Sequence, residues 1–120
     1  MSLHNREIGK IGENYSVEYL LKNNYIIVAN NFRTEAGELD IIAKKENKLY
    51  FFEVKTRIGI AKGKPWEAIT PSKLRHIKTT AKYFLLKNDF KEYKLSLAVI
   101  SIILNPDRNV KEFKIYEIDY

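Results

Sequence analysis

Cysteine is absent from the chain of 120 residues, and proline and glycine are scarce. The lack of cysteine excludes disulfide bonds, thiolate zinc sites and cysteine nucleophiles. It also suits a reducing compartment, so we expect a cytoplasmic protein. The longest apolar run, residues 97–104, is interrupted by Ser101 and is far shorter than the roughly 20 residues that span a bilayer. Residues 1–6 contain no apolar run, so we expect neither a secretory signal nor a membrane partner.

The charge balance is basic. Lysine and arginine number 21 and aspartate and glutamate 15, which gives a net charge of +6. Such a field favours polyanionic partners, of which nucleic acid is the commonest. Charged residues at 30% and hydrophobic residues at 45% are typical of a globular protein. The length predicts a single domain over residues 1–120.

Two helices are predicted from apolar residues at helical spacing. The first covers residues 6–23, where Ile8, Ile11, Tyr15 and Tyr19 form the apolar face. The second covers residues 71–87 and has Thr70 as its N-cap. The glycine-rich segment 59–71 before it is expected to be a flexible loop.

Five strands are predicted from β-rich runs. They cover residues 25–29, 38–43, 49–56, 95–104 and 110–118. Asn30 and Asn31 are expected to end the first strand, and the next two strands form a hairpin that turns at residues 46–47. The predicted fold class is α/β, with the order α-β-β-β-α-β-β and a mixed β-sheet flanked by helices. The long connection after the third strand suits a parallel crossover.

The hairpin carries the most informative polar residues. Its register places Asp40 directly opposite Glu53, and cross-strand neighbours have Cβ atoms about 4.5–5.5 Å apart. Because side chains alternate along a strand, Glu53 and Lys55 share one face. Aromatic and aliphatic residues surround them, so the sequence predicts two partly buried carboxylates beside one lysine.

Two interpretations of this cluster remain open. Lys55 neutralises one carboxylate in an ordinary cross-strand ion pair, or a divalent cation neutralises both. Mg²⁺ and Mn²⁺ prefer carboxylate oxygens and water as ligands. A lysine beside such a cation suits metal-assisted phosphodiester hydrolysis.

Glu13 is a fourth candidate, at the edge of the apolar face of the first helix. A glutamate there is usually a surface residue, but it would point into the site if this helix packed against the hairpin. Gly9 and Gly12 each cost roughly 1 kcal/mol relative to alanine inside a helix. Their presence indicates close approach of another backbone or a ligand, unless the helix begins after them.

Five basic residues are candidates for phosphate contact. They are Arg33, Arg57, Lys62, Lys64 and Lys73. The N-terminus of the second helix also offers free amides to a phosphate. His4 and His76 are isolated in the sequence, and we expect both at the surface.

Five short motifs occur in one order along the chain. They are Gly9-x-x-Gly12-Glu13, Asn31-Phe32-Arg33, Gly37-Glu38-Leu39-Asp40, Glu53-Val54-Lys55-Thr56-Arg57 and Pro65-Trp66-Glu67-Ala68. The set resembles the YraN family of small bacterial proteins over nearly the whole chain. That family looks like a minimal member of the PD-(D/E)XK nuclease superfamily and is similar to archaeal Holliday-junction resolvases.

The resemblance implies a restriction-endonuclease-like core and a bound Mg or Mn ion. Asp40 and Glu53 would be metal ligands, joined by the main-chain carbonyl of Val54 and, directly or through water, by Glu13. Lys55 would be the catalytic lysine. DNA, in a branched or structured form, would be the substrate, and a homodimer would suit a junction.

Three functional hypotheses follow. The first is a metal-dependent nuclease-like protein with Asp40, Glu53, Lys55 and Glu13 as its catalytic residues. The second is a catalytically inactive nucleic-acid-binding module of the same fold. The third is a structural adaptor in which the hairpin charges form only salt bridges.

Overall fold

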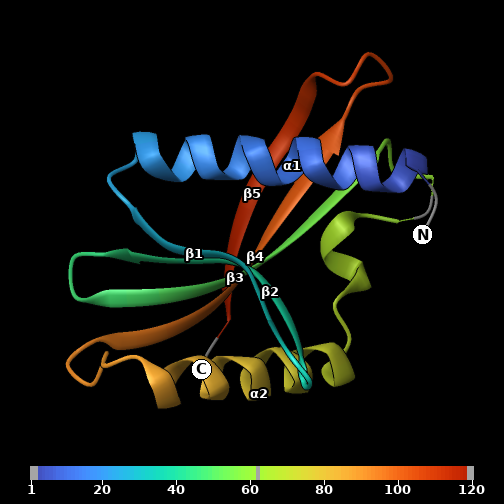
Figure 1. The fold of residues 1–120 in the computed structure, drawn as a ribbon. Helices are drawn as coiled ribbons and strands as arrows, with labels where there is room; N and C mark the ends of the chain where they lie inside the picture. The colour runs from blue at the N-terminus through green and yellow to red at the C-terminus, as the bar shows by residue number, and fades with distance from the viewer. Residues whose placement is uncertain (1–2, 62, 119–120) are drawn as a thin grey trace.

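The computed structural model describes residues 3–61 and 63–118. Its elements are α1 (Leu3–Lys22), β1 (Ile26–Thr34), β2 (Gly37–Lys45), β3 (Lys48–Ile58), the 3₁₀ helix η1 (Pro65–Ala68), α2 (Pro71–Lys87), β4 (Lys94–Leu104) and β5 (Val110–Ile118). The order α-β-β-β-α-β-β is therefore confirmed (Figure 1). The glycine-rich segment contains η1, which the sequence did not predict.

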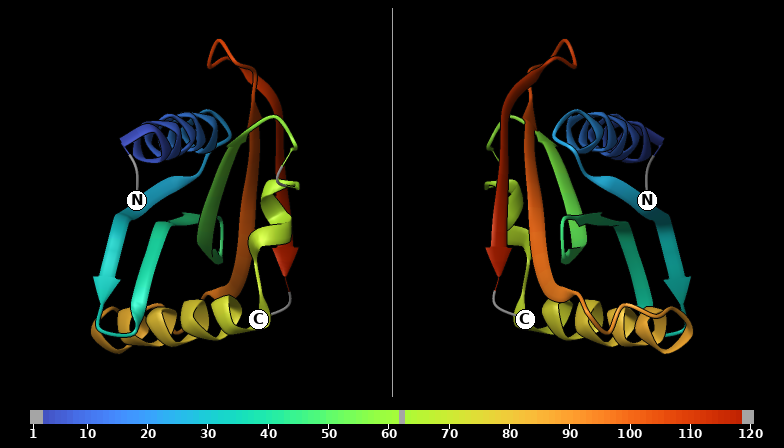
Figure 2. Two further views of the ribbon diagram at one scale, coloured as in Figure 1. Left: turned by 90° about the vertical axis from the view of Figure 1, so that its right-hand side faces the viewer. Right: turned by 90° about the vertical axis from the view of Figure 1, so that its left-hand side faces the viewer.

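The strands form one mixed sheet in the order β1-β2-β3-β4-β5. β3 and β4 are parallel and are joined through α2, whereas the other neighbouring pairs are antiparallel. The predicted hairpin and parallel crossover are both confirmed. α1 and η1 lie on opposite sides of β3, β4 and β5 (Figure 2). None of the described helices is long and apolar enough to cross a membrane.

Two apolar clusters fill the two sides of the sheet. The cluster under α1 is formed by Ile8, Leu20, Ile41, Ala43, Phe52, Ala98, Ile100, Ile102 and Leu104. The cluster under α2 is formed by Leu39, Ile42, Leu49, Phe51, Ile77, Ala81, Phe84 and Leu97. Because β3 and β4 supply buried side chains to both clusters, they form the centre of the fold.

The buried face of α1 differs from the predicted one. Tyr15 and Tyr19 lie at the surface, where their rings pack against Phe113 of β5. Ile8 is buried as predicted, and the other buried residues of the helix follow it at a spacing of four: Gly12, Ser16 and Leu20. The two small residues allow α1 to approach β3 closely, and hydrophobicity alone does not reveal such a face.

β1 extends beyond the predicted end at Asn30 and Asn31. The strand continues to Thr34, and Asn31 adopts a φ of 52° within it. Asparagine is among the residues that tolerate this left-handed conformation best. The strand therefore continues through both asparagines, with a local irregularity at Asn31.

α2 begins and ends as predicted. The backbone N–H of Lys73 donates to Oγ1 of Thr70 at 3.1 Å, which confirms Thr70 as the N-cap. Pro71 occupies the first helical position, where a missing N–H removes no helical bond. This cap fixes where the first turn of α2 begins, and therefore where Lys73 lies.

Gly12 sets the distance between α1 and β3. A Cβ atom at Gly12 would overlap the Thr56 hydroxyl and lie 2.9 Å from the Thr56 Cβ. We expect Gly12→Ala to lower the free energy of unfolding by about 1–3 kcal/mol, because overpacking outweighs the gain in helix propensity. Urea denaturation measures the difference.

Gly9→Ala is the matched control on the same helix. A Cβ atom there meets no described atom within 4 Å. We expect it to stabilise the protein by up to about 1 kcal/mol, the difference in helix propensity. Stabilisation by both substitutions would contradict close packing at Gly12.

Candidate functional site

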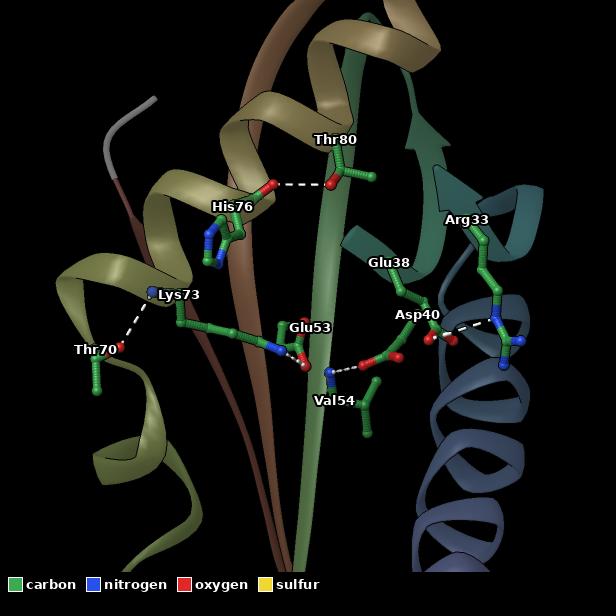
Figure 3. Close-up of polar contacts among 9 residues, drawn as sticks. All are labelled: Arg33, Glu38, Asp40, Glu53, Val54, Thr70, Lys73, His76 and Thr80. Carbon is green, nitrogen blue, oxygen red and sulfur yellow. Dashed lines mark hydrogen bonds and ion pairs between the residues drawn. The ribbon is translucent and has the colours of Figure 1, made fainter. Parts of the chain in front are cut away.

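β2 and β3 separate next to the two predicted carboxylates. Their paired residues run from Lys45–Lys48 to Ile41–Phe52, which is the predicted register. Asp40 and Glu53 come next in this register, but they do not form a ladder pair. Instead, Oδ2 of Asp40 accepts a hydrogen bond of 2.7 Å from the Val54 N–H (Figure 3). The predicted register therefore holds as far as Ile41 and Phe52, and at Asp40 this side-chain bond takes the place of the expected ladder pair with Glu53.

The strands bend at the same place. Leu39 packs in the cluster under α2, whereas Ile41, two residues later, packs in the cluster under α1. Regular alternation would put both on one face. Across from Asp40, Asn31 lies between two ladder pairs and has the positive φ described above. The bend turns Asp40 out of the regular pattern, so that its carboxylate reaches the backbone of β3.

Glu53 is the most buried ionisable group of the site, with 5% of its surface exposed. Its Oε1 lies 3.5 Å from Nζ of Lys73. Its Oε2 is buried and has no hydrogen-bond partner among the described residues. Burial, and then the charge of Asp40, raise the pKa of Glu53 to about 7, although Lys73 and Lys55 act in the opposite direction.

The pKa of Asp40 is also raised. Burial is the largest cause that raises the pKa of Asp40, and the charge of Glu38 adds to it. The hydrogen bond from Val54, the charge of Lys73 and the neighbouring Glu53 carboxyl group lower it. Because the two carboxyl groups lie this close, the ionisation of each depends on that of the other, and they titrate as a pair.

Glu13 faces the same site from α1. It is half-buried, and its pKa is raised first by burial and then by the charge of Asp40. A hydrogen bond from the Asn31 side chain lowers it. The close packing at Gly12 thus brings the acid of α1 toward the hairpin, as the sequence suggested for a helix packed there.

The lysine that contacts Glu53 is Lys73. Lys55 lies on the same face of β3, and its positive charge lowers the pKa of Glu53. The ion pair, however, comes from the third residue of α2 (Figure 3). Lys73 was predicted only as a phosphate contact, because the sequence does not show that the first turn of α2 lies over β3.

The other basic candidates are distributed differently. Arg33 is exposed, and its Nε lies 3.5 Å from Oε2 of Glu38. Arg57 is half-buried, and its Nε has no partner among the described residues. Lys64 is exposed beside η1, and Lys62 lies outside the described residues. His4 and His76 are exposed, which confirms that prediction.

The site contains two central carboxylates rather than a full ligand cage. No group of three or more histidine, aspartate or glutamate residues in the described part of the chain is arranged to hold a metal ion. The chemistry available to the site therefore rests on Asp40 and Glu53, on lysines at either side, and on Glu13 nearby.

Comparison with known proteins identifies related sequences. The model of the uncharacterised protein family UPF0102 matches residues 12–103. A UPF0102 protein of Caldicellulosiruptor saccharolyticus is 40% identical over 113 residues, which cover 94% of this chain and 96% of that protein. One of Clostridium botulinum (strain Loch Maree) is 42% identical over 102 residues, 84% and 83% of the two chains. One of Dictyoglomus turgidum is 36% identical over 108 residues, 90% and 92% of the two chains.

The raised pKa of Glu53 predicts how stability depends on pH. The native protein binds this proton more tightly than the unfolded chain, whose glutamate has a pKa near 4.5. The stability from this group is complete below about pH 4.5 and is lost as the pH rises through about 7. Glu53→Gln cannot ionise, so we expect it to raise the free energy of unfolding above neutral pH by about 1–3 kcal/mol.

Urea denaturation over a pH series in EDTA measures this effect. Glu18→Gln, an exposed glutamate on α1, is the control and should follow the wild type. Parallel pH profiles for the wild type and Glu53→Gln would show that Glu53 ionises normally in the native protein.

Proposed function

This chain belongs to the uncharacterised protein family UPF0102, the family of the YraN proteins that its motifs resemble, and we propose that it hydrolyses phosphodiester bonds in DNA with a divalent cation. The family name states no activity, so the proposal rests on the site. The supporting observation is the convergence of two largely buried carboxylates, Asp40 and Glu53, with one carboxylate oxygen left unpartnered among the described residues.

The donor set fits Mg²⁺ or Mn²⁺. Proteins usually hold Mg²⁺ through one or two carboxylates, with water and substrate phosphate as the remaining ligands. Asp40 and the free Oε2 of Glu53 would supply the carboxylates. In an extended strand, the N–H and C=O of one residue point to the same edge. Because the Val54 N–H binds Asp40, the Val54 carbonyl also faces this opening and suits a third position.

The surrounding residues have separate roles in this proposal. A bound divalent cation polarises a phosphate and lowers the pKa of a water. Lys55, on the same face as Glu53, would orient the attacking water and stabilise the charge that develops on the phosphate. Glu13 would hold a water next to Asp40. Lys73 would move from Glu53 to a phosphate oxygen when a cation takes its place.

The same layout supports the superfamily assignment. Asp40, Glu53 and Lys55 match the Asp, (D/E) and Lys positions of the PD-(D/E)XK pattern on neighbouring strands, although Leu39 replaces the proline before Asp40. A mixed sheet with flanking helices carries them. For the DNA, the net charge of +6 supplies long-range attraction. Arg33, Arg57, Lys62, Lys64 and Lys73 are proposed as phosphate contacts, and a homodimer would suit a branched substrate.

The first test of this function is metal binding. Calorimetric titration with Mn²⁺ should show binding to the wild type and none to Asp40→Ala, which removes one of two carboxylates. Lys73→Met should tighten binding roughly fivefold, because a positive charge beside the site opposes the cation by about 1 kcal/mol. Lys82→Met, at an exposed position on the same helix, is the control and should leave the affinity unchanged. Equal affinity in the wild type and Asp40→Ala would refute the metal site.

The second test is cleavage. Single-turnover assays would use single-stranded, duplex, flap and four-way-junction DNA with Mg²⁺ and with Mn²⁺. Lys55→Ala should retain metal affinity and lower the cleavage rate by about 10²–10³-fold, the usual cost of losing one charge-stabilising donor. Glu53→Ala should abolish both metal binding and cleavage. Lys111→Ala, exposed on β5, is the control.

Two outcomes would replace parts of this proposal. Binding of metal and DNA without cleavage of any substrate would favour a nucleic-acid-binding module of the same fold. Unchanged cleavage by Lys55→Ala would leave the metal site standing and remove the role given to Lys55.

A further inference from the structure

The sole tryptophan of the chain lies at the surface beside the candidate site. Trp66 is in η1, and 42% of its surface is exposed. Its ring contacts that of Tyr116 in β5, with a centroid distance of 6.0 Å and an interplanar angle of 56°. Tyr116 is itself 36% exposed. The two rings thus form an open aromatic pair, and neither belongs to the buried clusters.

The backbone that carries Trp66 is well fixed for so short a helix. Pro65 is buried, and η1 packs against β3 and β4. The Lys64 N–H donates to Oε1 of Glu67 at 3.2 Å, and the Ile69 N–H donates to the Trp66 carbonyl at 3.2 Å. The tryptophan is therefore presented from an anchored segment, which lowers the entropy lost when a ligand binds.

The aromatic pair shares a face of the sheet with Glu53. Val99 of β4 is the ladder partner of Glu53 on one side and of Tyr116 on the other. Ladder partners point to the same face, and two strand spacings amount to about 10 Å. η1 lies on this face, opposite α1 (Figure 2). One strand of nucleic acid is therefore long enough to place a phosphate near Glu53 and a base against Tyr116.

We propose that Trp66 and Tyr116 bind an unpaired nucleobase of a DNA strand whose phosphate lies at the Asp40–Glu53 site when a divalent cation is bound there. The choice of DNA as ligand rests on the proposed function. Aromatic side chains stack on any base because every base has a π-face, whereas in a duplex those faces are covered by neighbouring pairs. The pair therefore selects a single-stranded or locally unpaired region.

The surroundings favour a base over an apolar protein partner. Lys64 precedes Trp66 by two residues, and Glu67 directly follows it. Lys114 precedes Tyr116 by two residues on the same face of β5. The two rings are thus bordered by charged side chains rather than by a wide apolar surface. Glu67 is engaged by the Lys64 backbone, while the net charge of +6 attracts a polyanion.

Tryptophan fluorescence provides a direct test, because Trp66 is the sole reporter. Titration in EDTA with a short oligothymidylate should quench the emission. An abasic oligonucleotide of equal length and charge should bind more weakly and leave the emission unquenched, since it lacks the stacking group. A duplex of equal length should also leave it unquenched. Equal quenching by all three ligands, or no quenching by oligothymidylate, would overturn the proposal.

Variants test the pair by fluorescence anisotropy of a labelled oligothymidylate. Trp66→Leu and Tyr116→Leu should each weaken binding by roughly 5- to 150-fold, the range for loss of one stacking contact, whereas Trp66→Phe should retain most of the affinity. Tyr83→Leu, a tyrosine of α2 with 44% exposure, is the control and should bind like the wild type. Thermal unfolding of each variant confirms that it is folded.

The metal-dependent activity and the aromatic stacking site can be refuted independently of each other. These measurements contain no divalent cation, so absence of Mn²⁺ binding or of cleavage would refute the metal-dependent activity and leave the stacking result standing. Wild-type affinity in both leucine variants would refute the aromatic pair and leave the metal site untouched.

Discussion

The site depends on the point where β2 and β3 stop pairing. The ladder ends at Ile41 and Phe52, and the bend at Asp40 replaces the next pair with a bond from a carboxylate to the Val54 N–H. A regular hairpin would continue the ladder and cover the edge of β3. Because the strands separate, the carboxylates of Asp40 and Glu53 lie close together, next to a part of the β3 backbone that does not pair with β2. The separation thus creates both the electrostatic conflict and the space to resolve it.

The conflict lowers the stability of the protein without a cation. The pKa of Glu53 is about 7 because burial and Asp40 both oppose its charge, and Lys73 compensates only partly. Ionisable groups with strongly perturbed pKa values cluster at functional sites, although structural ion-pair networks also perturb them. α1 adds a third acid: its close packing through Gly12 places Glu13 within electrostatic range of Asp40. Close packing therefore brings together acidic side chains whose negative charges repel one another.

Local signals in the sequence predicted most of the elements. The limits of α2, its Thr70 cap and the register of the β2–β3 hairpin depend on residues close in the chain, and all agree with the structure. The burial of Gly12 and the pairing of Lys73 with Glu53 depend on how distant elements pack. The glycines of α1 indicated a close approach but not its partner, and no signal in the sequence indicated the pairing of Lys73. The site was therefore predicted as the hairpin with Glu13 of the first helix, whereas the structure adds the first turn of α2 through Lys73.

The distribution of charge bears on how a nucleic acid would reach such a site. Four of the 15 acidic residues, Glu13, Glu38, Asp40 and Glu53, interact around one point, so the rest of the molecule is more basic than its net charge of +6 indicates. A polyanion would be drawn to the molecule as a whole and repelled at the acidic cluster. A divalent cation at Asp40 and Glu53 reverses that local sign, and Lys73 is then released from its carboxylate partner. Under the proposed function, the cation thus allows the phosphate to approach the site and also activates it. The protein can bind a DNA strand elsewhere on its surface before a cation occupies the site.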